Sequence, residues 1–466
     1  MTFPAADTQP TLSNIAQFSA GAASSWDELA ARHRKLERLE VIVHDTHGVA
    51  RGKWLPVTSA AKVWSGSVCL PRSIFALDIW GREVTETGLH LDCGDVDGAC
   101  SPIPGSLAPV PWSDGKSAQV LLTMSTGGAP CLFDPRQLAA QAVARLTALG
   151  LTPVVAFELE FYLFHEAEGQ LGARPKPVAP QLSGPVAQNM YGLDDLHAVE
   201  PFLYAVREAA IAQNVAADSM LSEAAPGQFE INLKHQKDAL RAADEAVLLK
   251  RIIIHCARQA GFRASFMPKP LLDQAGSGMH VHVSLVNRSG DNVFSTEGPG
   301  DRLLEHAVAG ALASMPDFAL MFAPSFNGFR RIAPNSYAPT WPSWGHDNRS
   351  VAVRIPAGDR ANRRLEHRIS GADANPYLVL AALLHAICDG IDGHAVPPPP
   401  VTGNAYEREG DHLPTGLRAA IELFKSSATV RKNFGDVYQD MFAKLKKAEL
   451  TEFENRVSDL EYQTYL

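Results

Sequence analysis

The chain has 466 residues, more than one hydrophobic core usually supports, so two domains are the expectation. Apolar residues make up 46% and charged residues 20% of the sequence, as in an ordinary globular protein. The formal net charge of −9 argues against a nucleic-acid-binding protein, because contacts with phosphates need a basic surface.

Cysteines and targeting signals narrow the class further. The six cysteines form no CxxC pair, which argues against a zinc ribbon or a disulfide framework and favours buried free thiols. The first twenty residues contain no Lys, no Arg and no long apolar run, so we expect no secretory signal. The most apolar stretch, Leu378–Cys388, is too short to cross a bilayer. We therefore expect a cytoplasmic protein that binds neither nucleic acid nor a membrane.

The predicted elements begin with a loose arm and a small domain. Residues 1–24 are rich in Ala, Ser, Thr and Pro and are expected to be a flexible arm. Residues 25–125 predict a sheet-rich domain with many Gly and Pro. It is expected to begin with a helix in Trp26–Glu37, followed by strands at Leu39–His44 and Val49–Leu55.

Residues 126–466 predict a larger domain in which helices alternate with the strands of a sheet. Helices are expected at Arg136–Leu149 and Asp238–Ala260, each followed by a glycine that can end a helix. The expected strands are Val154–Phe164, Phe229–Leu233, Met279–Leu285, Val351–Ile355 and Arg364–Ile369. Residues 165–186 and 394–416, rich in Gly, Pro or polar side chains, are expected to be loops.

Carboxylates stand in pairs at two places. In VVAFELEFYLF, Glu158 and Glu160 are two residues apart, so in a strand both point to the same face. Two unpaired like charges in an apolar segment are costly and a divalent cation is the usual remedy, although an edge strand facing water explains them equally well. Glu223 and Glu230 flank Pro226–Gly227, a turn across which they can converge; taken alone, an ordinary polar turn is the simpler explanation.

Histidines follow a glycine loop in the segment Lys269–Ser284. His280, His282 and Ser284 alternate, so one strand face carries all three. Gly276–Gly278 precedes them and offers backbone N–H groups to an anion. A lone HxH pattern is often structural, but here anion-binding backbone lies next to a potential metal ligand. The segment therefore predicts a nucleotide–metal site.

An arginine-rich segment lies further along the chain. Arg364, Glu366 and Arg368 alternate in RRLEHR, and Arg349 and Arg354 lie upstream in NRSVAVR. Guanidinium groups match carboxylates and phosphates bidentately. A ladder of salt bridges on a solvated sheet is the simpler alternative and would contribute little stability.

Together these groups supply six potential metal ligands and an arginine-rich wall, a combination more specific than any part. The ligands are Glu158, Glu160, Glu223, Glu230, His280 and Glu366. Ligands dominated by oxygen favour Mg²⁺ or Mn²⁺ over zinc. Such ions beside arginines are the apparatus of phosphoryl transfer, where the catalyst mainly neutralises and positions charge.

Successive motifs resemble those of the glutamine synthetase family, in the same order and spacing: ELEFYLF, SEAAPGQFE, FMPKP to GSGMHVHVS, NRSVAVRIP, RRLEHR and ADANPYL. The resemblance implies an α+β fold, with an N-terminal β-grasp domain and a larger catalytic domain. It also implies a homo-oligomeric ring, a dodecamer, in which a neighbour's N-terminal domain completes each active site. ATP and two to three Mg²⁺ or Mn²⁺ ions would serve each site. The γ-carboxylate of glutamate would attack the γ-phosphate of ATP, and a nitrogen nucleophile would then displace phosphate.

The resemblance assigns the metal ligands and the nucleotide contacts to individual residues. One ion would be held by Glu160, Glu223 and Glu230. A second ion, which bridges the ATP phosphates, would be held by Glu158, His280 and Glu366. Contacts with the nucleotide would come from His282 and Ser284, and contacts with its phosphates from Arg354 and Arg364.

The glutamate contacts follow from the same resemblance. The α-carboxylate of glutamate would be clamped by Arg331 and Arg368, and the backbone of Gly276 would help to hold the amino acid. Arg349 would stabilise the transferring phosphoryl group.

The sequence departs from ammonia-using members of the family at one loop. In those enzymes a Glu-Ala-Pro supplies the acid that binds ammonium and removes its proton, whereas this chain has Tyr337-Ala-Pro. A phenol ordinarily has a pKa of about 10 and is a poor base at neutral pH. Trp341 and Trp344 follow, and they either border an amine pocket by cation–π contact or pack the loop. The family's DGSS-type loop is also missing, and Asp78 stands as the counterpart of its acid.

We therefore expect a ligase that joins the γ-carboxylate of L-glutamate to an organic amine, a polyamine or a monoamine. The branch of the family that glutamylates putrescine and polyamines resembles it most. The expected catalytic residues are Asp78, Arg331, Tyr337 and Arg349. The alternative is an ammonia-using glutamine synthetase whose ammonium acid comes from elsewhere, such as Asp78 of a neighbouring subunit. A catalytically silent structural relative is less favoured, because none of the six metal ligands is lost.

Overall fold

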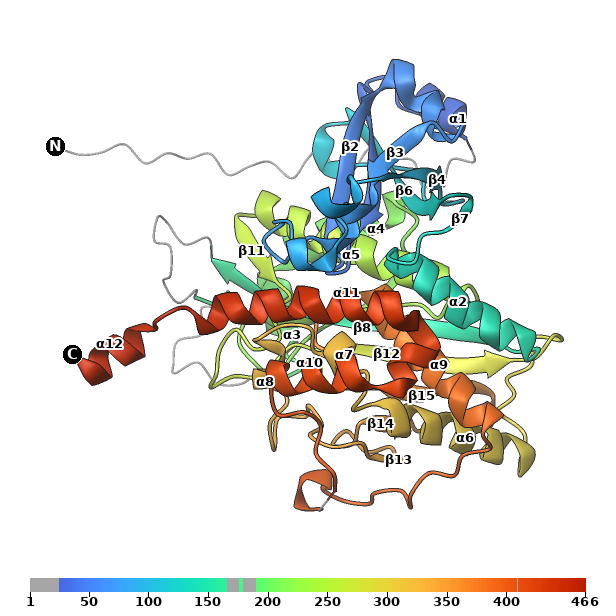
Figure 1. Cartoon of the computed structure of the whole chain (residues 1–466), viewed down its shortest axis with the longest axis vertical. Helices are drawn as coiled ribbons and strands as arrows, with labels where there is room; N and C mark the ends of the chain where they lie inside the picture. Colours follow the sequence, from blue (N-terminus) through green and yellow to red (C-terminus); the bar gives the residue numbers. More distant parts are fainter. Residues whose placement is uncertain (1–24, 166–175, 179–189, 409) are drawn as a thin grey trace.

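The computed structural model describes residues 25–165, 176–178, 190–408 and 410–466 (Figure 1). The predicted arm, residues 1–24, and most of the predicted loop 165–186 lie outside the described residues. The described part contains two sheets with helices packed around the larger one, which confirms the expected α+β class.

The smaller sheet belongs to the N-terminal part of the chain. Its strand order is β2-β1-β6-β4-β3, and β5 and β7 pair with β6. The strands are β1 (Arg38–His44), β2 (Ala50–Pro56), β3 (Val68–Pro71), β4 (Asp97–Pro102), β5 (Ala108–Pro109), β6 (Ser117–Thr126) and β7 (Ala129–Pro130). β1 is buried along nearly its whole length, whereas the edge strand β2 is largely exposed. Helix α1 (Trp26–Arg32) ends earlier than predicted, because the backbone leaves the helical region at His33.

The larger sheet has the strand order β13-β14-β15-β12-β8-β10-β9, and β11 pairs with β8. Its strands are β8 (Thr152–His165), β9 (Ala217–Ser222), β10 (Gln228–Leu233), β11 (Phe262–Ser265), β12 (Met279–Val286), β13 (Trp344–His346), β14 (Val353–Ile355) and β15 (Leu365–His367). All pairings along this order are antiparallel except β13 with β14. The five predicted strands are present, and β14 and β15 are shorter than predicted.

Helices cover the larger sheet and link it to the N-terminal domain. They are α2 (Pro135–Ala148), α3 (Leu193–Ala198), α4 (Glu200–Ala212), α5 (Ala239–Gln259), α6 (Pro299–Ser314), α7 (Ala319–Phe322), α8 (Gly328–Arg331), α9 (Pro376–Asp392), α10 (Leu417–Ser426), α11 (Ala428–Glu454) and α12 (Asp459–Tyr465). The two predicted helices correspond to α2 and α5. Asp238 caps α5 by accepting hydrogen bonds from the N–H groups of Leu240 and Arg241. The described residues of the predicted loop 394–416 are irregular apart from one 3₁₀ turn, Ala405–Glu407.

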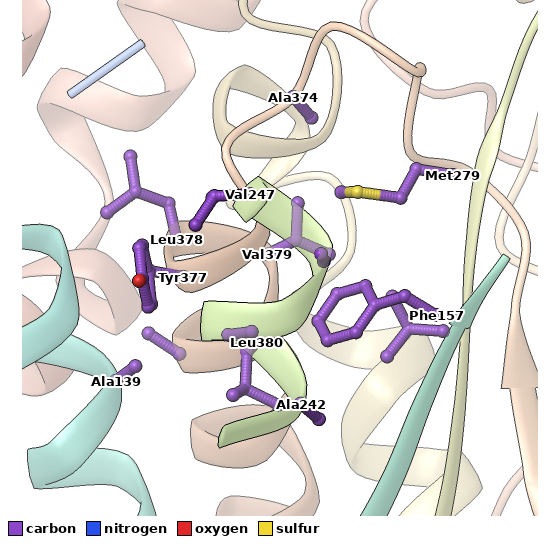
Figure 2. Packing of buried hydrophobic residues seen from close by; sticks show 14 of the residues in the cluster. Ala139, Phe157, Ala242, Val247, Met279, Ala374, Tyr377, Leu378, Val379 and Leu380 are labelled. Carbon is purple, nitrogen blue, oxygen red and sulfur yellow. The ribbon is translucent and has the colours of Figure 1, made fainter. Parts of the chain in front are cut away.

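The core of the larger domain is organised around α9. This helix is apolar on nearly all sides and buried, as its composition requires. Figure 2 shows Tyr377–Leu380 between Ala139 of α2, Ala242 of α5 and the sheet residues Phe157 and Met279. Each fully buried leucine of such a core stabilises the fold by about 1.5–3 kcal/mol. No helix in the described ranges is long and apolar enough to cross a membrane.

The two domains are joined by buried polar contacts. Asn375, the N-cap of α9, donates hydrogen bonds from its side chain to the backbone oxygens of Asp45 and Thr46 in the β1–β2 turn. On α11 the buried carboxylate of Glu449 contacts His47 and accepts a hydrogen bond from the backbone N–H of Ile79. In Figure 1 α11 crosses the view below the N-terminal domain. The β1–β2 turn is thus fixed against the start of α9 and against α11.

Candidate active site

The register of the larger sheet brings the predicted residues together. On adjacent strands Glu158 lies opposite His280, and Glu160 lies opposite Glu230. One strand further, His282 lies opposite Glu366, which in turn lies opposite Arg354. Because side chains at alternate positions share a face, these rows place acids, histidines and an arginine side by side on one face of the sheet.

Two sets of potential metal ligands result. One atom from each of Glu158, His280 and Glu366 lies within 4.8 Å of the others, and the same holds for Glu160, Glu230 and His280. His280 Nδ1 is 3.2 Å from Glu158 Oε2, and its Nε2 is 3.7 Å from Glu160 Oε1. The first set consists of the three residues that the family resemblance assigns to the second ion. In the other set His280 stands where the sequence predicted Glu223, which belongs to neither set in the described part of the chain.

The acids of this cluster fall into two groups, those whose pKa is raised and those whose pKa is lowered. Burial, then the neighbouring carboxylates, raise the pKa of Glu230 to about 10. Burial and Glu160 raise the pKa of Glu223 to about 7. Burial opposes ionisation of Glu158 as well, but His282 and His280 hold its pKa well below the usual value.

Glu366 belongs with Glu158. Burial opposes its ionisation, but Arg368, followed by the two histidines, lowers its pKa to about 2. Buried acids facing one another with oxygen and imidazole ligands fit a hard divalent cation, because its charge offsets the burial and the repulsion that raise the pKa values of Glu230 and Glu223.

Glu223 reaches the cluster across a tight turn. Its backbone N–H donates to the oxygen of Gln228 at 2.9 Å, and Gly227 has φ +71°. A Cβ at Gly227 would lie 2.7 Å from the backbone oxygen of Val178, so the turn requires glycine. The predicted convergence of Glu223 and Glu230 is present as an electrostatic contact.

The glycine loop packs tightly against Arg331. The N–H of Gly278 donates to Glu160 Oε2 at 2.7 Å, and a Cβ at Gly278 would overlap Arg331 Nη2. A Cβ at Gly276 would lie 2.8 Å from Arg331 Cγ. Arg331 is buried and donates from Nη1 to the backbone oxygen of Ile369 at 2.8 Å. The predicted glutamate-binding residues Gly276 and Arg331 are therefore adjacent.

Arginines surround the cluster on its β15 side. Arg354 donates to Glu366 Oε2 at 2.8 Å and to Asp347 Oδ1 at 2.7 Å. Arg368 forms an ion pair with Glu366, and Arg364 Nε donates to His282 Nδ1 at 3.1 Å. Besides Arg331, four arginines are predicted to bind phosphate or glutamate. Three of them, Arg354, Arg364 and Arg368, contact residues of the cluster.

The fourth of these arginines and the predicted nucleotide serine lie further out. Arg349 is exposed in the loop before β14. Ser284 is half-buried on β12, at the position of this strand that pairs with Val154 of β8.

A cavity of about 300 Å³ opens beside the cluster. Glu158, His282 and Arg364 line it together with His235 and Lys234. The centroids of the His235 and His282 rings are 5.9 Å apart, and burial and the charge of His282 lower the pKa of His235 to about 4. Sequence reasoning missed His235, since the segment after β10 carries no motif that marks it.

Gln228 was also missed, although it stands inside the SEAAPGQFE motif. Its side-chain amide donates to the backbone oxygen of Gly276 at 3.0 Å and to Ser277 Oγ at 3.3 Å. It therefore fixes the glycine loop from β10. Its position directly after the Pro-Gly turn was the available signal.

The loop that carries Tyr337 is strained and exposed. Tyr337 has φ +55° and is 67% exposed, and Asn335 also has a positive φ. Backbone of this kind in non-glycine residues is uncommon and gathers at functional sites. Trp341 Nε1 donates to the backbone oxygen of Ala405 and Trp344 Nε1 to that of Pro398, which favours the packing explanation for both tryptophans.

Asp78 lies in the N-terminal domain, where its carboxylate is hydrogen-bonded within its own turn. Its carboxylate accepts hydrogen bonds from the backbone N–H groups of Trp80 and Arg82, and from Arg82 Nε at 2.7 Å. Its role as an acid in a neighbouring active site stays a prediction.

Comparisons with known proteins agree with this geometry. The family model "Glutamine synthetase, catalytic domain" matches residues 132–465. The γ-glutamylputrescine synthetase PuuA of Escherichia coli (strain K12) is 39% identical over 438 residues, 93% of this chain and 93% of that protein. The γ-glutamylethanolamide synthetase GlnA4 of Streptomyces coelicolor is 33% identical, covering 83% and 80%. A glutamate–isopropylamine ligase of a Pseudomonas species is 32% identical, covering 91% and 93%. The solved structure "Apo GmaS without ligand" superposes with a TM-score of 0.82 at 25% identity, covering 95% of this chain and 99% of that one.

Proposed function

Since the chain belongs to the glutamine synthetase family, we propose that it is an ATP-dependent ligase that joins the γ-carboxylate of L-glutamate to an organic amine. The observation that carries the proposal is the cluster of facing acids and histidines backed by arginines on one sheet face. The named activities of three relatives, directed at putrescine, ethanolamine and isopropylamine, favour an organic amine over ammonia. Tyr337 agrees with that choice, because it stands where ammonia-using enzymes have an acid.

Two to three Mg²⁺ or Mn²⁺ ions would be held by the two ligand sets and Glu223. When bound, such ions neutralise phosphate charge and hold the reacting oxygens in line. The first set, with Glu158 and Glu366, borders the cavity and the arginines, so it belongs to the nucleotide phosphates. The second set, with Glu160 and Glu230, is joined to the glycine loop by the Gly278–Glu160 hydrogen bond and belongs to the glutamate.

The chain's own residues orient the two substrates. The 300 Å³ cavity offers His282, Arg364 and Lys234 to the nucleotide, and Ser284 and Arg354 extend this side. Arg331 and Arg368 are placed to clamp the α-carboxylate of glutamate beside Gly276. A γ-carboxylate oxygen then bonds to the γ-phosphorus of ATP while the bond to ADP breaks, and Arg349 stabilises the transferring group.

The second step forms the amide. The amine nitrogen attacks the γ-carbonyl carbon of γ-glutamyl phosphate, phosphate leaves, and one amine proton is lost. Tyr337 borders the amine in this proposal, because its loop begins directly after Arg331. By resemblance, a neighbouring subunit of a ring contributes its N-terminal domain, including Asp78, to the same site.

The test is a panel of nucleophiles. Purified protein is given L-glutamate, ATP and Mg²⁺ with ammonium, putrescine, spermidine, ethanolamine or isopropylamine, and phosphate release is followed together with the mass of the product. We expect an organic amine to have the highest kcat/KM, with ammonium at least about tenfold lower.

Each other result points to a stated alternative. Ammonium as the best nucleophile would establish a glutamine synthetase instead. Absence of phosphate release with every amine, despite ATP binding, would establish a silent relative. The variant Glu230→Gln should lose release with all amines, which assigns the activity to this cluster.

A further inference from the structure

A second and larger cavity, of about 590 Å³, lies between the two domains. Residues of β1 and β2 form one wall, and α5 together with Phe266 forms the other. We call it the interdomain pocket. It shares no lining residue with the cavity beside the acid cluster. Its volume is that of a typical small-molecule site.

Most of the charged side chains that line the interdomain pocket are cationic. The cations are Arg51, Lys53, Lys250, Arg251 and Arg258, and Glu40 is the one carboxylate among these described lining residues. Glu40 is already ion-paired with Arg251, and Asp45 behind the wall is paired with Arg51 at 2.8 Å. The pocket therefore carries a net positive charge.

Three of these cations form no ion pair within the described ranges, although the charge of Asp373 acts on Lys250 from outside the pocket lining. Lys250 Nζ donates to the backbone oxygen of Ala374 at 2.9 Å, and Lys53 Nζ to that of Cys69 at 2.9 Å. Arg258, on the outer turn of α5, is exposed and forms no ion pair with any residue that the structure describes. A carbonyl oxygen satisfies a donor but does not neutralise a charge, so the positive potential persists.

The positive charges of the pocket contribute to lowered pKa values of two histidines in its lining. Burial, followed by the charges of Arg251 and Lys250, lowers the pKa of His44 to about 3. Burial, followed by Arg251 and Arg258, lowers the pKa of His255 to about 4. His44 is only 7% exposed, and its ring nitrogens form no hydrogen bond with a described residue. The imidazole of His44 lines the pocket and can donate a hydrogen bond to a ligand there.

Most of the remaining lining residues, apart from these two histidines, are apolar. Val247 and Ile254 of α5 and Phe266 contribute carbon surface. His255 stacks on Trp112 with ring centroids 4.4 Å apart, and the guanidinium of Arg251 lies over the same indole. These contacts restrict the side chains before any ligand binds, which lowers the entropic cost of binding. A ligand with a short carbon skeleton fits this surface better than a bare inorganic ion.

We propose that the interdomain pocket binds a small organic anion with at least two acidic groups. Lys250 and Arg251 hold one acidic group at the inner end, and Arg258 holds the other at the mouth of the pocket. The imidazole of His44 donates a further hydrogen bond. The site is separate from catalysis and binds whether or not the proposed ligase reaction takes place.

Isothermal titration calorimetry on the full chain tests this proposal. The active site is first saturated with glutamate, ADP and Mg²⁺, so that the acid cluster and its cavity cannot take up the probe. Succinate and 3-phosphoglycerate serve as probes, because they place two acidic groups, either two carboxylates or a carboxylate and a phosphate monoester, on a short skeleton. We expect at least one of them to bind with one site per chain, and the stronger probe identifies the acidic group that the pocket prefers.

Variants locate the site. Arg258→Gln and Lys250→Met should each weaken binding by about tenfold, the loss expected for one charge-assisted hydrogen bond. Arg207→Gln is the matched control, because Arg207 is an exposed arginine on α4 outside the pocket, and it should leave the affinity unchanged. Light scattering and melting temperatures should show that all three variants keep the mass and fold of the parent protein.

Four results would overturn the proposal. Neither probe binds; glutamate and ADP displace the probe, which places it in the active site; the pocket variants bind as tightly as the control; or the pocket variants change the oligomeric mass, which makes the pocket a contact between copies of the chain.

Discussion

Two regions of this protein gather charges of one sign, and they do so in opposite ways. In the larger sheet, carboxylates on neighbouring strands face each other at positions fixed by the register, with His280 between the two ligand sets. In the interdomain pocket, long cationic side chains reach across a space from a helix and an edge strand. The first arrangement suits ions of fixed geometry, and the second suits a ligand to which flexible side chains adapt.

The largest effect should come from breaking the acid region. Glu230→Gln removes a facing carboxylate without changing the size of the side chain, and kcat/KM should fall on the order of 100-fold or more. In metal-free protein the same change should raise the free energy of unfolding by about 1 kcal/mol, because folding no longer has to protonate a buried carboxyl group whose pKa is raised to about 10. Phosphate release and urea unfolding in EDTA measure the two effects.

A matched variant separates this result from a general loss of charge. Glu305→Gln alters an exposed carboxylate on α6 and should change neither activity nor stability. If Glu230→Gln lowered both the activity and the free energy of unfolding of the metal-free protein, the facing carboxylates would not be what destabilises the acid region.

The second effect concerns the edge of the acid region where glutamate is proposed to bind. Gly278→Ala adds a Cβ that overlaps Arg331 Nη2, so the guanidinium must move. We expect the KM for glutamate to rise by about 10- to 100-fold while the KM for ATP stays within about twofold. Gly416→Ala is the control, because a Cβ there meets no atom within 4 Å. Equal changes in both KM values would argue against a role of Arg331 in binding glutamate.

The residues of the acid region could be grouped from the sequence because strand alternation is a local rule. It places Glu158 with Glu160 and His280 with His282 before any tertiary contact is known. It could not show that His280 stands between both ligand sets, since that depends on β12 lying between β8 and β15. Gln228 was missed for the same reason, because its contact with the glycine loop is a contact across the fold.

The interdomain pocket could not be predicted from the sequence. Lys250, Arg251 and Arg258 read as the charged face of a long amphipathic helix, a pattern that usually faces water. Only the packing of β1 and β2 against α5 turns part of this face into a cavity wall. The helix itself was predicted correctly, because Asp238 and Gly261 mark its ends by local chemistry.

A smaller effect is expected at the rim of the acid region. Tyr337→Glu places an acid where the family resemblance implies one in ammonia-using enzymes, at an exposed position. The ratio of kcat/KM for ammonium to that for the best organic amine should rise by about tenfold, because a carboxylate can bind ammonium and remove its proton. Tyr337→Gln is the neutral control. A similar ratio in both variants would show that the loss of the phenol, and not the gain of the acid, sets the preference.

The smallest effect tests whether a buried charge destabilises the cationic region, as buried carboxyl groups destabilise the acid region. Burial lowers the pKa of Lys250 to about 8 from 10.5, while Asp373 opposes the shift. Between pH 8 and 10.5 the unfolded chain therefore binds more protons at this residue than the folded chain does. The contribution of Lys250 to stability should rise with pH across this window and be lost again as pH falls to 8, with a slope of at most about 1.4 kcal/mol per pH unit.

Urea unfolding of the parent protein and of Lys250→Met at pH 8, 9 and 10 measures this slope. The difference in unfolding free energy, parent minus variant, should increase with pH, whereas the same difference for Arg258→Gln should stay flat, because arginine keeps its charge over this range. A bound anion stabilises the charged lysine and raises its pKa, so succinate should flatten the slope for Lys250. If succinate binds but leaves this slope unchanged, the anion lies away from Lys250, at the mouth of the pocket. The buried charge of Lys250 would then destabilise the cationic region even with the anion bound, unlike the acids of the other region, whose repulsion a bound cation offsets.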